Sequence, residues 1–437
     1  MRNVFDQYSQ NENKLTHALF AALNNDPDLL ACFIKNICGV SPPKSPELQI
    51  CVQTYPWAKN YPDGDSKARN IRNIPDAWIF DEKSEFTMVF EAKITAPLDE
   101  NQLKGHEDIA KKYRPESNSM YFFTIVGTIP TPGTRENAKS GAWTELYWSD
   151  IYLWLRKKPC KKPSIWAKHA ADFFELLETR MMKDGKMHNT AITEFDGFPK
   201  FENDYSYSVA KLKLRQAMAK LRENTDLITR LGMDPEHKGR ASITGSRERG
   251  VWDIIKLNSG PEEKSSDKFM HLTLSLSETD VMAEITIPNG LNGPPRKRLK
   301  ELGKDGFRDV CLMILNKMDH ILRDNEKATP KVGGYQRRYK SQGAVPDEDA
   351  ILRFDLRTAL VTGAGSRQEQ KFQPKFQPQW LDALYDVFIS HKSNFQFGIG
   401  ISFKHNDCPK IHTPESLKLI ADTWLACEPL ISLCKNE

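Results

Sequence analysis

The stretch IPDAWIFDEKSEFTMVFEAKI, residues 74–94, decides the expected fold of the first part of this chain. β-Branched and aromatic residues are concentrated in 74–80 and again in 86–93, and the polar segment Asp81 to Ser84 lies between them. This pattern predicts two strands that are joined by a tight turn. The two strands are expected to pair as a hairpin inside a larger sheet.

Three charged side chains stand on these expected strands. Glu91 and Lys93 are two residues apart, so they share one face of the second strand, and Asp76 on the first strand reaches the same place if the strands pair. A charge at the end of an apolar strand is costly unless something uses it. Two carboxylates and an amine can hold a divalent metal and activate a water, which is the chemistry that cuts a phosphodiester. A surface salt bridge at a strand end is the alternative interpretation.

The segment before the hairpin adds a third carboxylate. Residues 11–24 are predicted to form a helix, because Leu15, Leu19 and Leu23 recur at intervals of four. Glu12 falls on the same inward-facing side, where an acidic group needs a metal, a metal-bound water or a cation as its partner. Alternatively, Glu12 only occupies the helix N-terminus, where a negative charge is favourable.

The segment after the hairpin is predicted to be a helix over 99–113. Gln102 and His106 are four residues apart and therefore lie on one face of it. We expect Gln102 to point back at the charged cluster, where its amide could bind a phosphate oxygen or the amine of Lys93. His106 could point at the same place, but a packed or solvated helix histidine is the expected role for it.

The rest of the chain predicts two domains, 1–187 and 188–437. A strand over 119–127 and a helix over 165–182 complete an α/β first domain with a mixed central sheet flanked by helices. The second domain is expected to be α+β. Its predicted helices are 209–231, 307–322 and 415–433, and its predicted strands are 272–276, 281–287, 351–356 and 395–403.

Composition limits the class of protein. The 437 residues carry a net charge of only +4, which does not by itself indicate nucleic acid. The chain has no apolar run of about 20 residues and no apolar leader, and its eight cysteines are scattered, so we expect a cytoplasmic protein with reduced thiols and no membrane partner. His405, Cys408 and His412 lie close in sequence, but without a second ligand pair they predict an ordinary loop rather than a zinc site.

The motif residues resemble the PD-(D/E)xK nuclease superfamily, which has the restriction-endonuclease-like fold. The matching residues are Pro75-Asp76, the triplet Glu91-Ala92-Lys93, the helical Glu12 and the following Gln102. The resemblance covers about residues 1–180, and its specificity comes from the order and spacing of these residues. The second domain matches no family that we can name.

The resemblance implies a role for each residue. Asp76 and Glu91, with the backbone carbonyl of Ala92, would hold Mg²⁺, for which Mn²⁺ could substitute. Lys93 would orient or deprotonate the attacking water, and Glu12 would bind a second metal or its water. Gln102 would complete the catalytic set.

The expected function is a metal-dependent endonuclease that cuts DNA rather than RNA, in bacterial restriction or anti-phage defence. The second domain would recognise a target, a signal or a partner subunit, and cutting both strands of a duplex would favour a homodimer. A non-catalytic nucleic-acid-binding scaffold and a nuclease subunit of a repair or transposition complex remain alternatives. Four basic clusters could contact a nucleic-acid backbone: Lys67, Arg69 and Arg72; Lys157, Lys158, Lys161 and Lys162; Arg296, Lys297, Arg298 and Lys300; Arg337, Arg338 and Lys340.

Overall fold

The computed structural model of the chain describes most of its residues. The described residues are 5, 8–43, 48–56, 74–81, 86–114, 117, 119–127, 142–157, 159–183, 192–200, 206–237, 239–240, 245–246, 250–257, 268–291, 293–338, 347–361, 375–390 and 394–434. Most of the expected turn after residue 81 lies outside these ranges. So do one basic cluster, at Lys67, Arg69 and Arg72, and two further lysines, Lys158 and Lys340.

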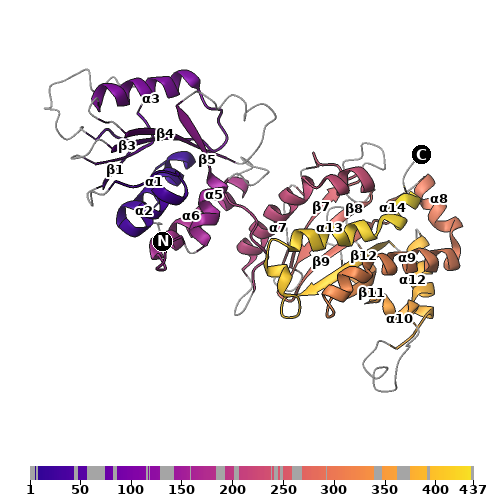
Figure 1. The fold of residues 1–437 in the computed structure, drawn as a ribbon. Helices are drawn as coiled ribbons and strands as arrows, with labels where there is room; N and C mark the ends of the chain where they lie inside the picture. Colours follow the sequence, from indigo (N-terminus) through magenta and orange to yellow (C-terminus); the bar gives the residue numbers. More distant parts are fainter. Residues whose placement is uncertain are drawn as a thin grey trace. The chain divides into compact units, whose positions relative to one another are not determined.

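The chain divides into two compact units, Met1–Glu194 and Phe195–Glu437 (Figure 1). From the sequence alone, this boundary is expected between residues 187 and 188. Phe195 and Phe198 belong to the second unit because both side chains are buried in its hydrophobic core, where their rings meet edge to face. The chain is therefore a mixed α/β protein in which each unit buries hydrophobic residues of its own.

The first unit contains a mixed five-stranded sheet in the order β1-β2-β3-β4-β5. β1 pairs antiparallel with β2 and β2 antiparallel with β3, whereas β3–β4 and β4–β5 are parallel. The parallel β3–β4 pair requires a crossover, which α3 provides. The strands are β1 (Leu48–Val52), β2 (Ala77–Asp81), β3 (Phe86–Ala92), β4 (Ser119–Val126) and β5 (Trp143–Tyr147).

Helices cover both faces of this sheet. Figure 1 shows α3 on one side and the other helices of the unit on the opposite side. Every residue of β2 and β3 is buried, which explains why both strands read as nearly continuous apolar runs. The helices are α1 (Asn11–Asn25), α2 (Pro27–Asn36), α3 (Glu100–Tyr113), α5 (Trp148–Arg156) and α6 (Ile165–Lys183).

The two sheet faces have different packing partners. Trp78 and Val89 pack with Leu103 and Ala110 of α3. On the opposite face, Phe90 contacts the rings of helical phenylalanines from α1 and α2. Because side chains alternate along a strand, Glu91 at the end of β3 shares the face of Val89 and therefore faces α3.

The start of α3 is fixed by a cap. Asp99 accepts hydrogen bonds from the backbone N–H groups of Asn101 (2.9 Å) and Gln102 (3.4 Å). This cap sets where the first turn begins, and it thereby sets which side chains of α3 turn toward the end of β3.

The second unit is built on an antiparallel sheet in the order β11-β10-β12-β9-β8-β7-β6. Leu272, Leu274 and Leu276 alternate with polar positions on β8 and point into the core. The strands are β6 (Gly245–Ser246), β7 (Gly250–Lys256), β8 (His271–Leu276), β9 (Asp280–Ile287), β10 (Thr329–Arg338), β11 (Asp347–Asp355) and β12 (Phe395–Lys404).

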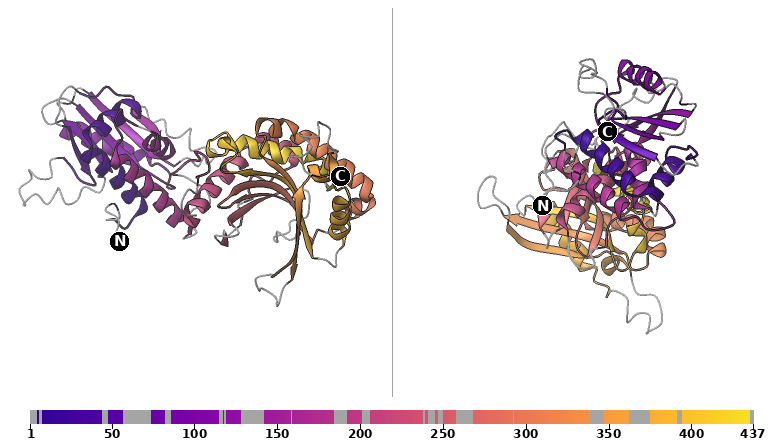
Figure 2. Two further views of the ribbon diagram at one scale, coloured as in Figure 1. Left: turned by 90° about the horizontal axis from the view of Figure 1, so that it is seen from below. Right: turned by 90° about the vertical axis from the view of Figure 1, so that its left-hand side faces the viewer.

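The described helices of this unit gather on one face of the curved sheet (Figure 2). The expected helix over 209–231 ends at Arg222, and the Asn224 side chain accepts a hydrogen bond from Leu227 N (3.0 Å) at the start of a separate turn. The elements are α7 (Tyr207–Arg222), the π-helical turn η3 (Leu227–Leu231), α8 (Pro294–Glu301), α9 (Gly303–Asp324), α10 (Arg357–Leu360), α12 (Gln379–Ile389), the 3₁₀ turn η5 (Pro409–His412), α13 (Ser416–Ala426) and α14 (Glu428–Cys434).

No helix in the described ranges combines the length and the apolar character that a bilayer crossing needs. None of the eight cysteines, all of which lie in the described ranges, forms a disulfide bond.

Candidate active site

The ends of β2 and β3 bring two carboxylates together. Ala77 of β2 pairs with Phe90 of β3. The next residue toward the site is therefore Asp76 on the first strand and Glu91 on the second. Both side chains are largely withdrawn from water, with residue exposures of 7% for Asp76 and 1% for Glu91. The backbone N–H of Ala92 donates to Asp76 Oδ2 over 2.7 Å, which ties the first carboxylate to the neighbouring strand.

Glu91 is the most heavily hydrogen-bonded group of the site. Its Oε1 accepts from Lys93 Nζ (2.5 Å) and from Gln102 Nε2 (2.8 Å). Its Oε2 lies 3.1 Å from Nε2 of His106, a residue with no exposed surface. The predicted proximity of Gln102 to the cluster is thus observed, and its partner is Glu91.

Glu12 reaches the same place from the first turn of α1. Its Oε1 is 3.4 Å from Lys93 Nζ, and its Oε2 accepts from the backbone N–H of Ile94 over 3.3 Å. The backbone at Lys93 is itself held, because its N–H donates to Ile125 O (2.8 Å) and its carbonyl accepts from Trp148 Nε1 (3.2 Å). The structure therefore brings Asp76, Glu91, Lys93, Glu12 and Gln102 into one cluster, with Ala92 between two of them.

The charges of this cluster perturb one another. Burial, followed by the nearby charge of Glu91, raises the pKa of Asp76 to about 7, although the hydrogen bond from Ala92 N–H and the charge of Lys93 act to lower it. Burial also acts to raise the pKa of Glu91, but the hydrogen bond from His106 and the charge of Lys93 outweigh it, so that pKa is lowered. Burial acts to lower the pKa of Lys93, yet the Glu91 carboxylate raises it overall.

Two residues of the cluster were not predicted to belong to it. His106 is packed, which is one of the two roles expected for it, but it also contacts Glu91. Its position four residues after Gln102, on the same helix face, was the sequence feature that could have predicted this contact. Gln53, immediately after β1, places its side-chain amide against Asp76 Oδ1. No sequence pattern marks Gln53, because the contact depends on how β1 ends.

The donor set suits a hard divalent cation. Asp76 and Glu91 supply carboxylate oxygens. Together with Glu12 they place three carboxylates around the amine of Lys93. Among the described residues, no group of three or more His, Cys, Asp or Glu side chains is arranged to hold a metal ion. Mg²⁺ typically takes one or two carboxylates and completes its shell with water and phosphate, so a pair of carboxylates fits it.

The expected basic clusters differ from one another. Arg296 is only 3% exposed; it donates to the Phe388 carbonyl over 2.9 Å and lies over that ring, so it does not form part of a surface phosphate track. Arg337 stacks on Tyr335, and Arg338 forms ion pairs with Asp347 and Asp349.

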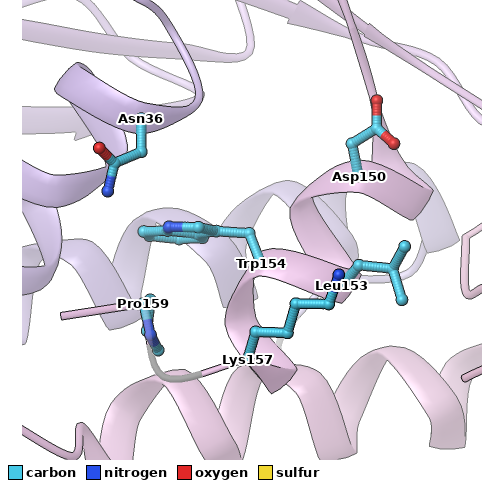
Figure 3. Close-up of a pocket in the computed structure, with 6 residues that line it drawn as sticks. All are labelled: Asn36, Asp150, Leu153, Trp154, Lys157 and Pro159. Atoms are coloured by element: carbon cyan, nitrogen blue, oxygen red, sulfur yellow. The ribbon is translucent and has the colours of Figure 1, made fainter. Parts of the chain in front are cut away.

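Two other features of the chain do not include the clustered residues. A pocket of about 360 Å³ in the first unit contains none of the clustered residues (Figure 3); its lining residues are Asn36, Asp150, Leu153, Trp154, Lys157 and Pro159. His405 and His412 hydrogen-bond backbone carbonyls of Ser277, Phe198 and His405 through their ring nitrogens.

Comparison of the chain with protein-family models, with curated proteins and with solved structures finds no match.

Proposed function

We propose that this protein is a metal-dependent endonuclease that hydrolyses phosphodiester bonds of DNA. The observation that carries the proposal is the convergence of Asp76, Glu91 and Lys93 at the ends of two paired strands, with Glu12 joining from a helix. A mixed sheet flanked by helices, with the acidic residues at the ends of adjacent strands, is also what the resemblance to the PD-(D/E)xK nucleases implies.

The carboxylates would hold the metal. Asp76 and Glu91, with the carbonyl of Ala92, are the residues proposed for Mg²⁺ or Mn²⁺, and Glu12 for a second ion or its water. A bound divalent ion would lower the pKa of a water and offset the charge that develops on the phosphate. Because Asp76 is anchored by Ala92 N and Glu91 by His106, each carboxylate keeps a fixed orientation without a cation.

Lys93 and Gln102 would handle the reacting groups. Both now donate to Oε1 of Glu91. In the metal-bound site the N–H groups of both side chains would be available to the attacking water and to a phosphate oxygen. Lys93 would orient the water and stabilise the negative charge of the transition state, and such preorganised donors commonly contribute 10²–10³-fold or more in rate.

The second unit is proposed to recognise the target, a signal or a partner subunit, in restriction or anti-phage defence. Cleavage of both strands of a duplex would then require two chains, which favours a homodimer. Two alternatives keep the same site: a nuclease subunit of a repair or transposition complex, and a nucleic-acid-binding scaffold without activity.

The test is cleavage of plasmid DNA, and of an RNA of matched length, by the purified chain with MgCl₂. Lys93→Ala is compared with Lys111→Ala, which removes a lysine whose side chain is 61% exposed on α3. We expect wild type and Lys111→Ala to cut DNA at the same rate and Lys93→Ala to be at least about 10²-fold slower. Equal cutting by all three would refute the site, and binding of DNA without cutting by any of them would favour the scaffold alternative.

A further inference from the structure

Gln53 adopts a backbone conformation that its residue type disfavours. Its φ is 52°, in the left-handed region, and Asn394 (φ 45°) is the other non-glycine residue with positive φ in the described part of the chain. Asparagine tolerates this region because its short side chain can bond locally, whereas glutamine has no such advantage. Strained backbone that persists in a fold commonly marks a residue whose side chain is needed where it is.

The contacts of Gln53 show what its side chain does. Its backbone N–H donates to the carbonyl of Asp76 over 3.0 Å, next to the Val52–Ala77 pair that ends the β1–β2 ladder. Its amide Nε2 donates to Asp76 Oδ1 and lies 3.4 Å from Asn13 Oδ1 on α1. Gln53 thus links the end of β1, the start of β2 and the first turn of α1.

The two oxygens of Asp76 are held in different ways. Oδ2 accepts from the backbone N–H of Ala92, a donor that cannot move without β3. Oδ1 accepts from the Gln53 side chain, a donor that can rotate away or share the oxygen. Oδ1 is therefore the oxygen that can exchange a protein donor for a cation, and the amide of Gln53 keeps it oriented until then.

We propose that Gln53 is a positioning residue for Asp76, and that the left-handed backbone at residue 53 is retained because it brings the amide to Oδ1. This inference rests on the proposed function, because it assigns to Gln53 the orientation of Asp76, a proposed metal ligand. The alternative is a purely conformational role, in which residue 53 only turns the chain at the end of β1 and its side chain is not needed.

Two substitutions separate these roles. Gln53→Gly removes the amide and relieves the backbone strain, whereas Gln53→Met removes the amide, keeps a side chain of similar length and keeps the strain. Asn394→Gly in the second unit is the matched control, because it removes a side chain from the other left-handed position. Mn²⁺ affinity by calorimetry, thermal unfolding without metal, and DNA cleavage are measured for each full-length variant.

We expect both Gln53 variants to bind Mn²⁺ about 10-fold or more weakly and to cut more slowly by a similar factor, as for other residues that orient metal ligands. Gln53→Gly should nevertheless unfold at the wild-type temperature or above it, and Gln53→Met below it. Asn394→Gly should leave Mn²⁺ binding and cleavage unchanged.

The outcomes distinguish the two proposals. If wild type binds Mn²⁺ and cuts DNA, and both Gln53 variants do so equally well, the positioning role is wrong and the nuclease assignment stands. If wild type binds Mn²⁺ without cutting, and both variants bind it more weakly, the positioning role stands and the nuclease assignment does not. A wild-type chain that does not bind Mn²⁺ would overturn both.

Discussion

Both units of this protein withdraw carboxylates from water, but they differ in how strongly one carboxylate acts on another. In the second unit Asp253 accepts from the backbone N–H groups of Arg240 (2.7 Å) and Ile254 (2.9 Å), and Glu284 forms an ion pair with Arg353 at 3.2 Å. Burial raises the pKa of Glu284, and the charge of Asp280 is the smallest of the effects on it, whereas in the first unit the charge of Glu91 is second only to burial in raising the pKa of Asp76.

The sheet of the second unit is shaped around its ion pair. Glu284 lies opposite Gly400, and Arg353 lies opposite Gly333. A Cβ at Gly398, which pairs with Gly333, would come within 2.7 Å of Glu284 Oε2. The glycines of β10 and β12 leave space for the side chains of Arg353 and Glu284 to meet across these two strands. The ion pair therefore has a structural role in the sheet and needs no ligand to account for it.

In the first unit three carboxylates share the amine of one lysine, because Lys93 pairs with both Glu91 and Glu12 while Asp76 lies beside Glu91. Bringing like charges together in a buried place raises the free energy of the folded state unless a cation is bound or a proton is taken up. Perturbed groups that converge in this manner are typical of functional sites. The contrast predicts that polar substitutions in the first unit affect activity and that equivalent ones in the second affect stability.

The largest expected effect is that of Glu91→Gln on cleavage. The substitution removes a proposed metal ligand and the charge that Lys93 faces, so we expect a loss of about 10³-fold in DNA cleavage. Glu284→Gln, at a partly buried carboxylate of the second unit, should cleave at the wild-type rate. Initial rates of plasmid nicking measure both, and a similar loss in the two variants would remove the contrast between the units.

A smaller loss is expected from His106→Asn. His106 does not reach the proposed metal but holds Oε2 of Glu91, and loss of such an orienting partner typically costs 10–100-fold in metal affinity or activity. The comparison is His271→Asn, at a histidine in the second unit that is 3% exposed and bonds the Phe269 carbonyl. Cleavage rates and Mn²⁺ titrations should separate the two variants; wild-type values for His106→Asn would limit that histidine to packing.

The third prediction concerns the metal-free stability of Asp76→Asn. The pKa of Asp76 is about 7 in the folded protein, against 3.8 for the ordinary group. Between these two values the folded protein holds a proton on Asp76 that the unfolded chain has lost, so the stability of the fold falls as pH rises from about 4 to 7. In EDTA at pH 8, where this penalty is complete, the uncharged variant should melt several degrees above wild type. Thermal unfolding at pH 5 and pH 8 measures the difference, which should shrink at pH 5; a lower melting temperature for the variant at pH 8 would contradict it.

The smallest effect is expected in the second unit, on the pH dependence of unfolding below pH 6.5. Burial lowers the pKa of His271 to about 4 from 6.5, so its contribution to stability is complete above pH 6.5 and is lost as pH falls toward 4. His271→Gln should therefore flatten the pH dependence of unfolding in this window without altering DNA cleavage at neutral pH. An unchanged pH profile would show that His271 does not carry this dependence.

The candidate site was largely predictable because its elements are locally encoded. β2 and β3 are apolar runs, the carboxylates stand at fixed positions on them, and Asp99 caps α3 so that Gln102 follows at a known offset. Gln53 was not predictable, since its role depends on a left-handed turn after β1 and on a contact with Asp76, 23 residues away.

In the second unit, some strands and helix ends could not be predicted from the local sequence pattern. The strands predicted over 272–276 and 281–287 are present as β8 and β9, which pair antiparallel as neighbours. β10, whose sequence TPKVGGYQRR is polar and glycine-rich, was not predicted, because this strand is stabilised by pairing with β11 and β12 on its two sides. Helix 209–231 was predicted too long because its apolar spacing continues past the break at Asn224.

One pair of variants tests the central claim most directly: Asp76→Asn and Asp253→Asn, each measured for Mg²⁺-dependent DNA cleavage and for thermal unfolding in EDTA. The two variants should stay folded and differ in cleavage. Asp76→Asn loses cleavage, whereas Asp253→Asn, at a buried carboxylate that is held by backbone N–H groups and whose pKa burial also raises, cuts DNA at the wild-type rate. Cleavage by Asp76→Asn at the wild-type rate would contradict the account.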